Sequence, residues 1–209
     1  KLQVVRTVPR STNSYDRTPL DGTSSDSSPP VSREIRPHRR EEYSTLESYG
    51  LAIVNAKRFI YIENQYFTCE FLIEVLKRRL KQVPELSLVV LLPSKSELSY
   101  PGEDEAYRFL TSFSRAVAQE KVLATSAFKD LQAVGGDRVF FASPVNADGE
   151  EIYVHSKLMI VDDVYATIGS ANFSQRSMYI DLELGVAWRD EGQTSIRKFR
   201  HELWSERSE

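Results

Sequence analysis

The stretch IYVHSKLMIVDD, residues 152–163, decides the fold that we predict for this chain. Apolar and β-branched residues dominate it, which predicts a strand up to Val161, and Asp162 with Asp163 supply the polar residues that are typical of a turn. The residues from Val164 to Ile168 predict a second strand. Together they predict a β-hairpin.

Two polar side chains lie inside the first predicted strand. Side chains of a strand alternate between its faces, so His155 and Lys157 should point the same way, with their Cα atoms about 6.6 Å apart. A lysine supplies a point charge for a phosphate, and an imidazole can act as a nucleophile or carry a proton near neutral pH. The pair therefore predicts an anion-binding site that performs chemistry.

More polar groups follow the predicted hairpin. Residues 181–188 alternate again between polar and apolar, which predicts a strand with Glu183 on its polar face. A carboxylate beside an imidazole fixes its tautomer and orientation, so we expect Glu183 to orient His155. Ser170 and Asn172, in a glycine-containing turn, are expected to donate hydrogen bonds to phosphate oxygens.

The spacing HxKxxxxD from His155 to Asp162, followed after six residues by GSxN at 169–172, resembles the HKD signature of the phospholipase D superfamily. Upstream, YIENQYF at 61–67 resembles the segment that opens the second catalytic half of eukaryotic-type phospholipases D, and residues 2–7 resemble the strand before it. The resemblance implies phosphodiester hydrolysis or transfer on glycerophospholipids through a phosphohistidine intermediate. It also implies two HKD motifs that meet across a pseudo-twofold interface.

The resemblance assigns a role to each residue of the motif. His155 would be the general acid and base, or the nucleophile, while Lys157 and Asn172 would hold the phosphate oxygens with help from Ser170. Asp162 belongs to the catalytic signature, but its place at the turn and on the other face of the strand predicts that it organises the hairpin. The scheme needs no metal and no other cofactor, and the sequence contains no cluster of metal-ligating residues.

The number of histidines determines which partner we expect. Cleavage through a covalent intermediate needs one group to attack phosphorus and another to protonate the leaving alcohol. Of the three histidines, only His155 has a lysine partner, since His38 lies in a polar tract and His201 in a predicted helix. We therefore expect a second HKD half, from the same full-length protein or another chain, to complete the site. This chain alone should be inactive.

Two alternatives remain open from the sequence. Two copies of this chain that pair symmetrically would form a homodimeric nuclease or other phosphodiesterase. A non-catalytic half would only bind phosphorylated ligands or support a partner domain. The formal net charge of −3 makes nucleic acid the less favoured substrate.

The rest of the sequence predicts an α/β fold, a layered α/β/α sandwich with a mixed central sheet. Residues 1–8 form its first strand, residues 9–43 a polar loop or insert rich in Ser and Pro, and residues 44–209 the domain that carries the HKD motif. Within that domain a capping box at Ser44–Glu47 predicts the start of a helix. The sequence predicts helices at 45–57, 71–83, from 101 to 117 and at 196–204, strands at 58–62, 86–92 and 138–142, and a turn at 146–149.

The polar residues Glu63, Asn64 and Gln65 directly follow the predicted buried strand 58–62. Open α/β sheets bind ligands at the carboxyl ends of their strands, although the side chains of Asn64 and Gln65 would also suit a simple turn. The resemblance favours a place in the wall of the site.

Composition sets outer limits. The 209 residues suffice for one sizeable domain, and no apolar run approaches the ~20 residues that cross a bilayer, so we expect a soluble or peripheral membrane protein. The single cysteine, Cys69, excludes an intrachain disulfide and predicts a packed thiol. The sequence begins at Lys1 without a Met and without an apolar signal segment, as a processed piece or an artificially cut one would.

Overall fold

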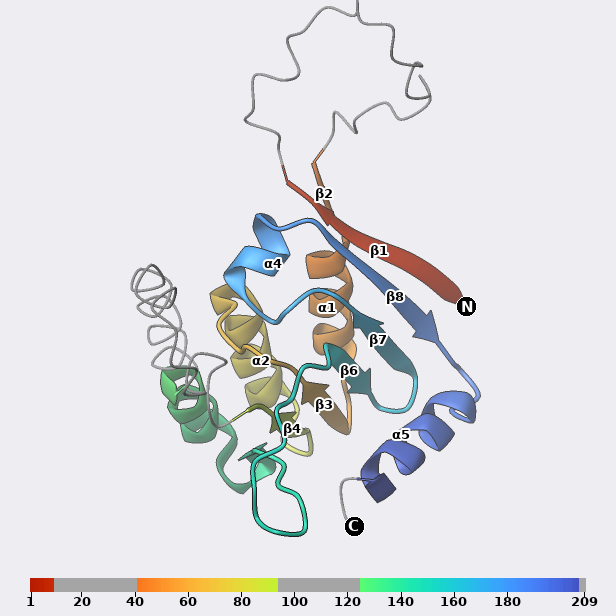
Figure 1. The fold of residues 1–209 in the computed structure, drawn as a ribbon. Helices are drawn as coiled ribbons and strands as arrows, with labels where there is room; N and C mark the ends of the chain where they lie inside the picture. The colour runs from red at the N-terminus through yellow and green to blue at the C-terminus, as the bar shows by residue number, and fades with distance from the viewer. Residues whose placement is uncertain (10–40, 94–124, 207–209) are drawn as a thin grey trace, which may run out of the picture.

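The computed structural model describes residues 1–9, 41–93 and 125–206 (Figure 1). Eight strands in these ranges form one sheet with the order β2-β1-β8-β7-β6-β3-β4-β5. The strands are β1 Leu2–Val8, β2 Glu42–Tyr43, β3 Phe59–Glu63, β4 Ser87–Leu91, β5 Val139–Ala142, β6 Leu158–Val161, β7 Tyr165–Gly169 and β8 Glu183–Arg189. β3, β4 and β5 run parallel and the other neighbours pair antiparallel, which confirms the predicted mixed sheet.

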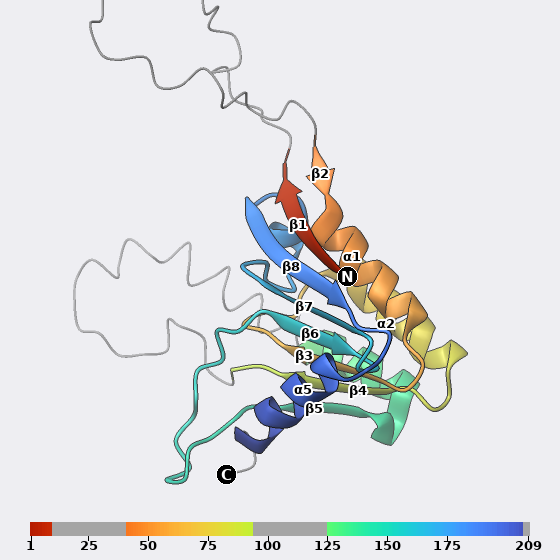
Figure 2. The same cartoon turned by 90° about the vertical axis from the view of Figure 1, so that its right-hand side faces the viewer.

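Helices cover both faces of the sheet, as Figure 2 shows. They are α1 Ser44–Asn55, α2 Glu70–Gln82, a helix over residues 125–135 that the 3-10 turn Gly136–Arg138 follows, α4 Gln175–Tyr179 and α5 Ser195–Glu206. α1 and α2 lie on one face, and α5 lies on the other. The layered α/β/α prediction is therefore confirmed. The predicted helix from 101 to 117 and most of the predicted insert at 9–43 lie outside the described residues.

The larger hydrophobic core lies under α1 and α2. α1 turns Tyr49, Ala52 and Ile53 toward the sheet, and α2 contributes four buried side chains at helical spacing. Those side chains are Leu72, Ile73, Leu76 and Leu80. Cys69 precedes α2 and is fully buried, as predicted, and burial raises the pKa of its thiol to about 11. This core fixes the C-terminal end of β3, which leads directly into the site.

The predicted capping box is wrong. Ser44 is the first residue of α1, and no side chain caps the helix. The hydroxyl of Ser44 instead accepts from the backbone N–H of Arg6 at 2.8 Å and donates to its carbonyl at 3.1 Å. The hydroxyl is committed to β1, so it cannot also serve the helix.

The smaller core lies under α5. Ile196, Phe199 and Leu203 of α5 pack on Tyr61 and Ile160 of the sheet. The Arg200 guanidinium pins the helix because it donates to both carboxylate oxygens of the fully buried Asp163, at 2.7 and 2.9 Å. α5 covers only part of its face of the sheet, as Figure 2 shows.

The central hairpin is shorter than predicted. β6 begins at Leu158, and residues 152–157 form no strand, because the neighbouring β3 ends at Glu63, the partner of Leu158. The turn itself is confirmed: Asp162 and Asp163 have positive φ values of 55° and 60°, and the Val164 N–H donates to the Val161 carbonyl at 2.9 Å. Val161 pairs with Tyr165, so residues 162–164 form the loop. The predicted turn at 146–149 is also present, where the Gly149 N–H donates to the Asn146 carbonyl.

In the ranges that the structure describes, no helix combines the length and hydrophobicity needed to cross a bilayer.

Candidate active site

The motif residues gather at one edge of the sheet because of how the strands alternate in direction. β6 is antiparallel to β3, β7 to β6 and β8 to β7. The C-terminal ends of β3 and β7 therefore lie beside the N-terminal ends of β6 and β8. This edge brings together residues 63–65, residues 155–157, Ser170 and Glu183.

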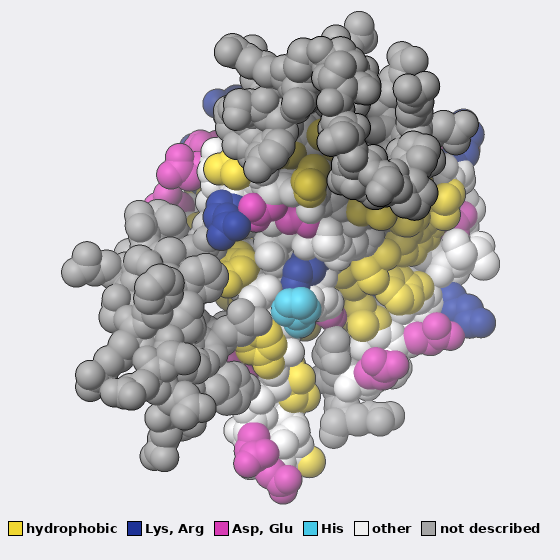
Figure 3. Space-filling view, turned by 45° about the horizontal axis from the view of Figure 1, so that its top comes forward, with side chains coloured by type: hydrophobic (Ala, Val, Ile, Leu, Met, Phe, Trp, Pro, Cys, Tyr) yellow, Lys and Arg dark blue, Asp and Glu magenta, His cyan; other side chains and the backbone are white. Residues whose placement is uncertain are grey.

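His155 and Lys157 differ sharply in exposure. The imidazole is exposed, whereas Lys157 is only 7% exposed and its ammonium donates to the carbonyl oxygen of His155 at 2.7 Å. The prediction that both residues belong to a strand is wrong, but the ammonium does lie against the residue that carries the imidazole. Figure 3 shows a histidine side chain that reaches the surface next to a basic one.

Gln65, predicted for the wall of the site, connects this lysine to an aromatic ring. Its amide oxygen accepts from the Lys157 ammonium at 3.3 Å, and its amide nitrogen donates to the Tyr153 hydroxyl at 2.6 Å. The Tyr153 ring stacks beside the imidazole of His155, with centroids 6.3 Å apart and planes 23° apart. Sequence reasoning missed Tyr153, although its position two residues before His155 in an extended stretch was the available signal.

Asn64, the other predicted wall residue, ties the end of β3 to the loop after β7. It is fully buried, and its side-chain oxygen accepts from the backbone N–H of Tyr66 and of Phe173, at 3.2 and 3.0 Å. The Phe67 and Phe173 rings stack with centroids 4.6 Å apart and reinforce this link. Asn172, adjacent to Phe173, is half-buried, and its side-chain oxygen is buried without a hydrogen-bond partner among the described residues.

Ser170 and Glu183 form a pair on neighbouring strands. The Ser170 hydroxyl donates to the Glu183 carboxylate in a short hydrogen bond and accepts from the Leu184 backbone N–H at 3.0 Å. The Gly169 N–H donates to the Lys157 carbonyl at 3.2 Å. Ser170, the next residue in the chain, is thereby held close to Lys157. Within the described part of the chain, no hydrogen bond joins Glu183 to His155, and the orienting role predicted for Glu183 stays a prediction.

Asp162 lies away from these groups. It follows the C-terminal end of β6, so the strand separates its Cα from that of Lys157 by roughly 16 Å. Its carboxylate accepts from the backbone N–H groups of Lys57, Arg58 and Phe59 at 2.6 to 2.9 Å. The place of Asp162 among the catalytic residues stays a prediction. Its contacts support the predicted organising role, in which this carboxylate ties the hairpin turn to the start of β3.

Two more residues of the site were missed from the sequence. Glu63 is 1% exposed at the end of β3 and accepts from the Ser156 hydroxyl at 2.6 Å. Ser156 stands between the two principal residues of the motif. A glutamate inside the apolar run FIYIE was the available signal. Among the described residues, no three or more His, Cys, Asp or Glu side chains group as metal ligands would.

Comparison with known proteins gives the family. The family described as "Cardiolipin synthase, PLD-like domain" matches residues 51–206, about three quarters of the chain. The chain belongs to the phospholipase D-like family. Its motif-bearing edge and its mixed sheet are therefore features of a phospholipase D-like domain.

Curated relatives carry the name phospholipase D. Phospholipase D zeta 2 of Arabidopsis thaliana is 32% identical over 183 residues, which cover 71% of this phospholipase D-like chain and 17% of the relative. Phospholipase D of Phytophthora infestans is 29% identical over 171 residues, 70% of this chain and 10% of the relative. The chain thus spans less than a fifth of these two proteins.

Solved structures share the fold. The phospholipase D family member Nuc of Salmonella typhimurium superposes with a TM-score of 0.57 at 16% identity, covering 99% of this chain and 93% of Nuc. Phosphatidylserine synthase of Haemophilus influenzae superposes with a TM-score of 0.55 at 13% identity, covering 99% of this chain and 38% of the synthase. A domain of this size and fold therefore makes up nearly all of Nuc but less than half of the phosphatidylserine synthase.

Proposed function

We propose that this phospholipase D-like chain supplies one half of an active site that hydrolyses or transfers the headgroup of glycerophospholipids through a phosphohistidine intermediate. The observation that carries the proposal is the convergence at one sheet edge of an exposed imidazole, a buried ammonium and short polar side chains. The curated relatives named phospholipase D support the lipid substrate. The net charge of −3 favours it over nucleic acid.

The motif residues would divide the work at phosphorus. The exposed His155 either attacks phosphorus or protonates the leaving oxygen, and a histidine of the second half takes the other role. Lys157 and Asn172 hold the phosphate oxygens and stabilise the charge that develops there, and Ser170 assists. Glu183 acts on the imidazole indirectly, through the position of Ser170 or after the second half has docked.

An exposed apolar sheet face beside the site supports the second half as partner. Side chains of residues that pair on adjacent strands point to the same face of the sheet. Val186 of β8 pairs with Val4 of β1 and with Ile168 of β7, so these three side chains share one face. α5 covers the neighbouring part of this face and leaves this part open. Five large apolar side chains there are 45% to 77% exposed: Leu2, Val4, Ile168, Leu182 and Leu184. Figure 3 shows hydrophobic side chains gathered beside the surface histidine.

Such a contiguous apolar surface next to a site commonly marks an interface. A partner that docks on this face would place its own motif opposite His155. A specific observation also favours a symmetric pair as the second candidate: one unit of this fold covers 93% of the chain of Nuc. A homodimeric phosphodiesterase would use the same face.

The test compares headgroup release from phosphatidylcholine vesicles by the complete protein and by its His155→Asn variant. We expect the variant to lose at least about a thousandfold in rate, as the loss of a nucleophile or general acid does. The matched control is His201→Asn, a histidine exposed on α5. Undiminished release by His155→Asn would contradict the proposal. Cleavage of an oligonucleotide by a dimer of this chain alone would favour the second candidate, and no turnover of either substrate would favour a non-catalytic half.

A further inference from the structure

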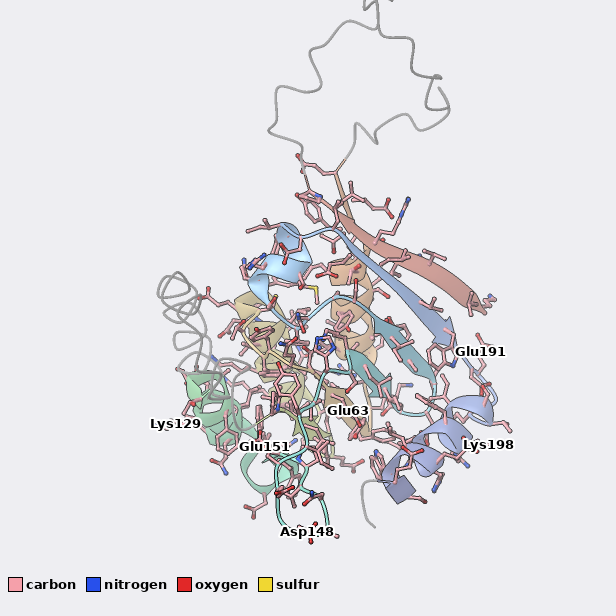
Figure 4. All side chains as sticks on the ribbon, in the orientation of Figure 1. Glu63, Lys129, Asp148, Glu151, Glu191 and Lys198 are labelled. Carbon is pink, nitrogen blue, oxygen red and sulfur yellow. The ribbon has the colours of Figure 1, made fainter. Side chains whose placement is uncertain are left out.

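A buried carboxylate lies directly behind the loop that carries the motif. Glu63, labelled in Figure 4, is 1% exposed at the C-terminal end of β3. Its two oxygens accept from two hydroxyls, Tyr61 at 2.5 Å and Ser156 at 2.6 Å. Burial of a charged group is costly unless hydrogen bonds compensate it, so both donors stabilise a carboxylate at this place.

The two hydroxyls come from different parts of the molecule. Tyr61 is buried in the core under α5, where its ring lies 5.4 Å from that of Trp204. Ser156 belongs to the loop before β6 and separates His155 from Lys157. Glu63 thus connects the rigid core of the sheet to the centre of the motif.

The loop lies beyond the end of the neighbouring strand. β3 ends at Glu63, the partner of Leu158, so it offers no strand partner to residues 154–156. Side chains must then define where the loop lies. The Ser156–Glu63 hydrogen bond is one of these contacts, and the Lys157–Gln65 bond is another.

We propose that Glu63 is a positioning residue of this active site. It touches no substrate; its carboxylate holds Ser156 and so fixes the imidazole of His155 and the ammonium of Lys157 on either side. The inference deepens the proposed function, because it concerns the phosphate site assigned there.

The two hydroxyls allow positioning to be separated from ordinary stability. Ser156→Ala and Tyr61→Phe each remove one donor to the same carboxylate, but only Ser156 lies in the motif loop. If Glu63 positions the loop, Ser156→Ala weakens phosphate binding and Tyr61→Phe does not. If Glu63 only stabilises the fold, both substitutions lower the melting temperature and neither changes phosphate affinity.

The experiment titrates inorganic phosphate into the 209-residue chain and follows the backbone amides of residues 155–157 by NMR. We expect Ser156→Ala and Glu63→Gln each to weaken binding about tenfold, the usual effect of one hydrogen bond to a charged group. Tyr61→Phe should remain within about twofold of wild type. The double variant Glu63→Gln/Ser156→Ala should bind no more weakly than Glu63→Gln, because both changes remove one interaction.

Wild-type affinity in both Ser156→Ala and Glu63→Gln would overturn the inference. If Glu63→Gln fails to fold, Ser156→Ala against Tyr61→Phe decides alone. If the wild-type chain binds no phosphate, the phosphate site of the proposed function fails, and the inference is judged by amide hydrogen exchange instead. Faster exchange at residues 155–157 in Ser156→Ala, but not in Tyr61→Phe, would then support Glu63 as positioning the loop, and unchanged exchange would refute it.

Discussion

Replacement of Asp162 should cost stability rather than chemistry. Its carboxylate accepts three backbone N–H groups, from Lys57 at 2.6 Å, Arg58 at 2.8 Å and Phe59 at 2.9 Å, and the residue is 7% exposed. A hydrogen bond to a charged group contributes about 1.5–3 kcal/mol. Water can reach the exposed Lys57 and Arg58, so the three bonds will not add fully. We expect Asp162→Ala to lower the free energy of unfolding by about 3 kcal/mol.

A second substitution tests the same reasoning at smaller scale. Asp162→Asn keeps one oxygen that can accept from Arg58 and Phe59, but it turns an N–H₂ group toward the N–H of Lys57. It also tolerates the positive φ of 55° better than alanine does. We therefore expect a loss of about 1.5 kcal/mol, between wild type and Asp162→Ala.

The assay is urea unfolding monitored by circular dichroism, with Asp148→Ala as the control. Asp148 is an exposed carboxylate in the 146–149 turn, and its removal should change stability by less than about 0.5 kcal/mol. An Asp162→Ala loss below about 1 kcal/mol would refute the account of the carboxylate. Full stability of Asp162→Asn together with lost turnover in the complete protein would place Asp162 in the catalytic group.

Three further predictions concern glycines and pH. Gly169→Ala should lower the free energy of unfolding by about 2 kcal/mol or more in the urea assay, because a Cβ there would lie 2.6 Å from the Cα of Gly185 on β8; a loss below about 0.5 kcal/mol would contradict this. Gly50→Ala in α1 should raise the free energy of unfolding by about 0.5–1 kcal/mol, because alanine favours a helix and its Cβ would lie at an ordinary 3.8 Å from the Phe71 ring. A loss of stability would argue against this packing of α1. Asp190 accepts from the Ser195 hydroxyl and from backbone N–H groups at the start of α5, and these bonds, that of Ser195 first, lower its pKa from 3.8 to about 2. The ionised carboxylate therefore stabilises the fold above pH 3.8, and this contribution is lost as the pH falls from 3.8 through about 2. The difference in the free energy of unfolding between wild type and Asp190→Asn, followed by tryptophan fluorescence, should shrink between these two pH values and stay constant above pH 3.8.

The elements that the sequence predicts well are those whose apolar periodicity sets both type and place. α1, α2, β3 and β4 follow from such patterns, and the Asp162–Asp163 turn follows from its residue types. The sequence predicts a strand at residues 152–157 because alternation of polar and apolar residues indicates extended backbone. Strand pairing depends on the partner, and β3 ends before reaching them.

The site was predicted in composition more than in geometry. The motif placed His155, Lys157 and Ser170 together because residues at one sheet edge meet whenever antiparallel strands alternate. It could not show that the Lys157 ammonium folds back onto a carbonyl or that Ser170 takes up the Glu183 carboxylate. Such contacts depend on which of several neighbouring side chains forms the hydrogen bond in the folded protein, and the spacing of residues along the sequence does not determine this.

The central claim is that this chain holds half of an active site. The most direct measurement is headgroup release from phosphatidylcholine vesicles by the 209-residue chain, with its mass determined by light scattering in the same sample, before and after the remainder of the complete protein is added. We predict no release by the monomeric chain and release after the second HKD half is added, lost again with His155→Asn. Turnover by the chain while it is monomeric would contradict the account.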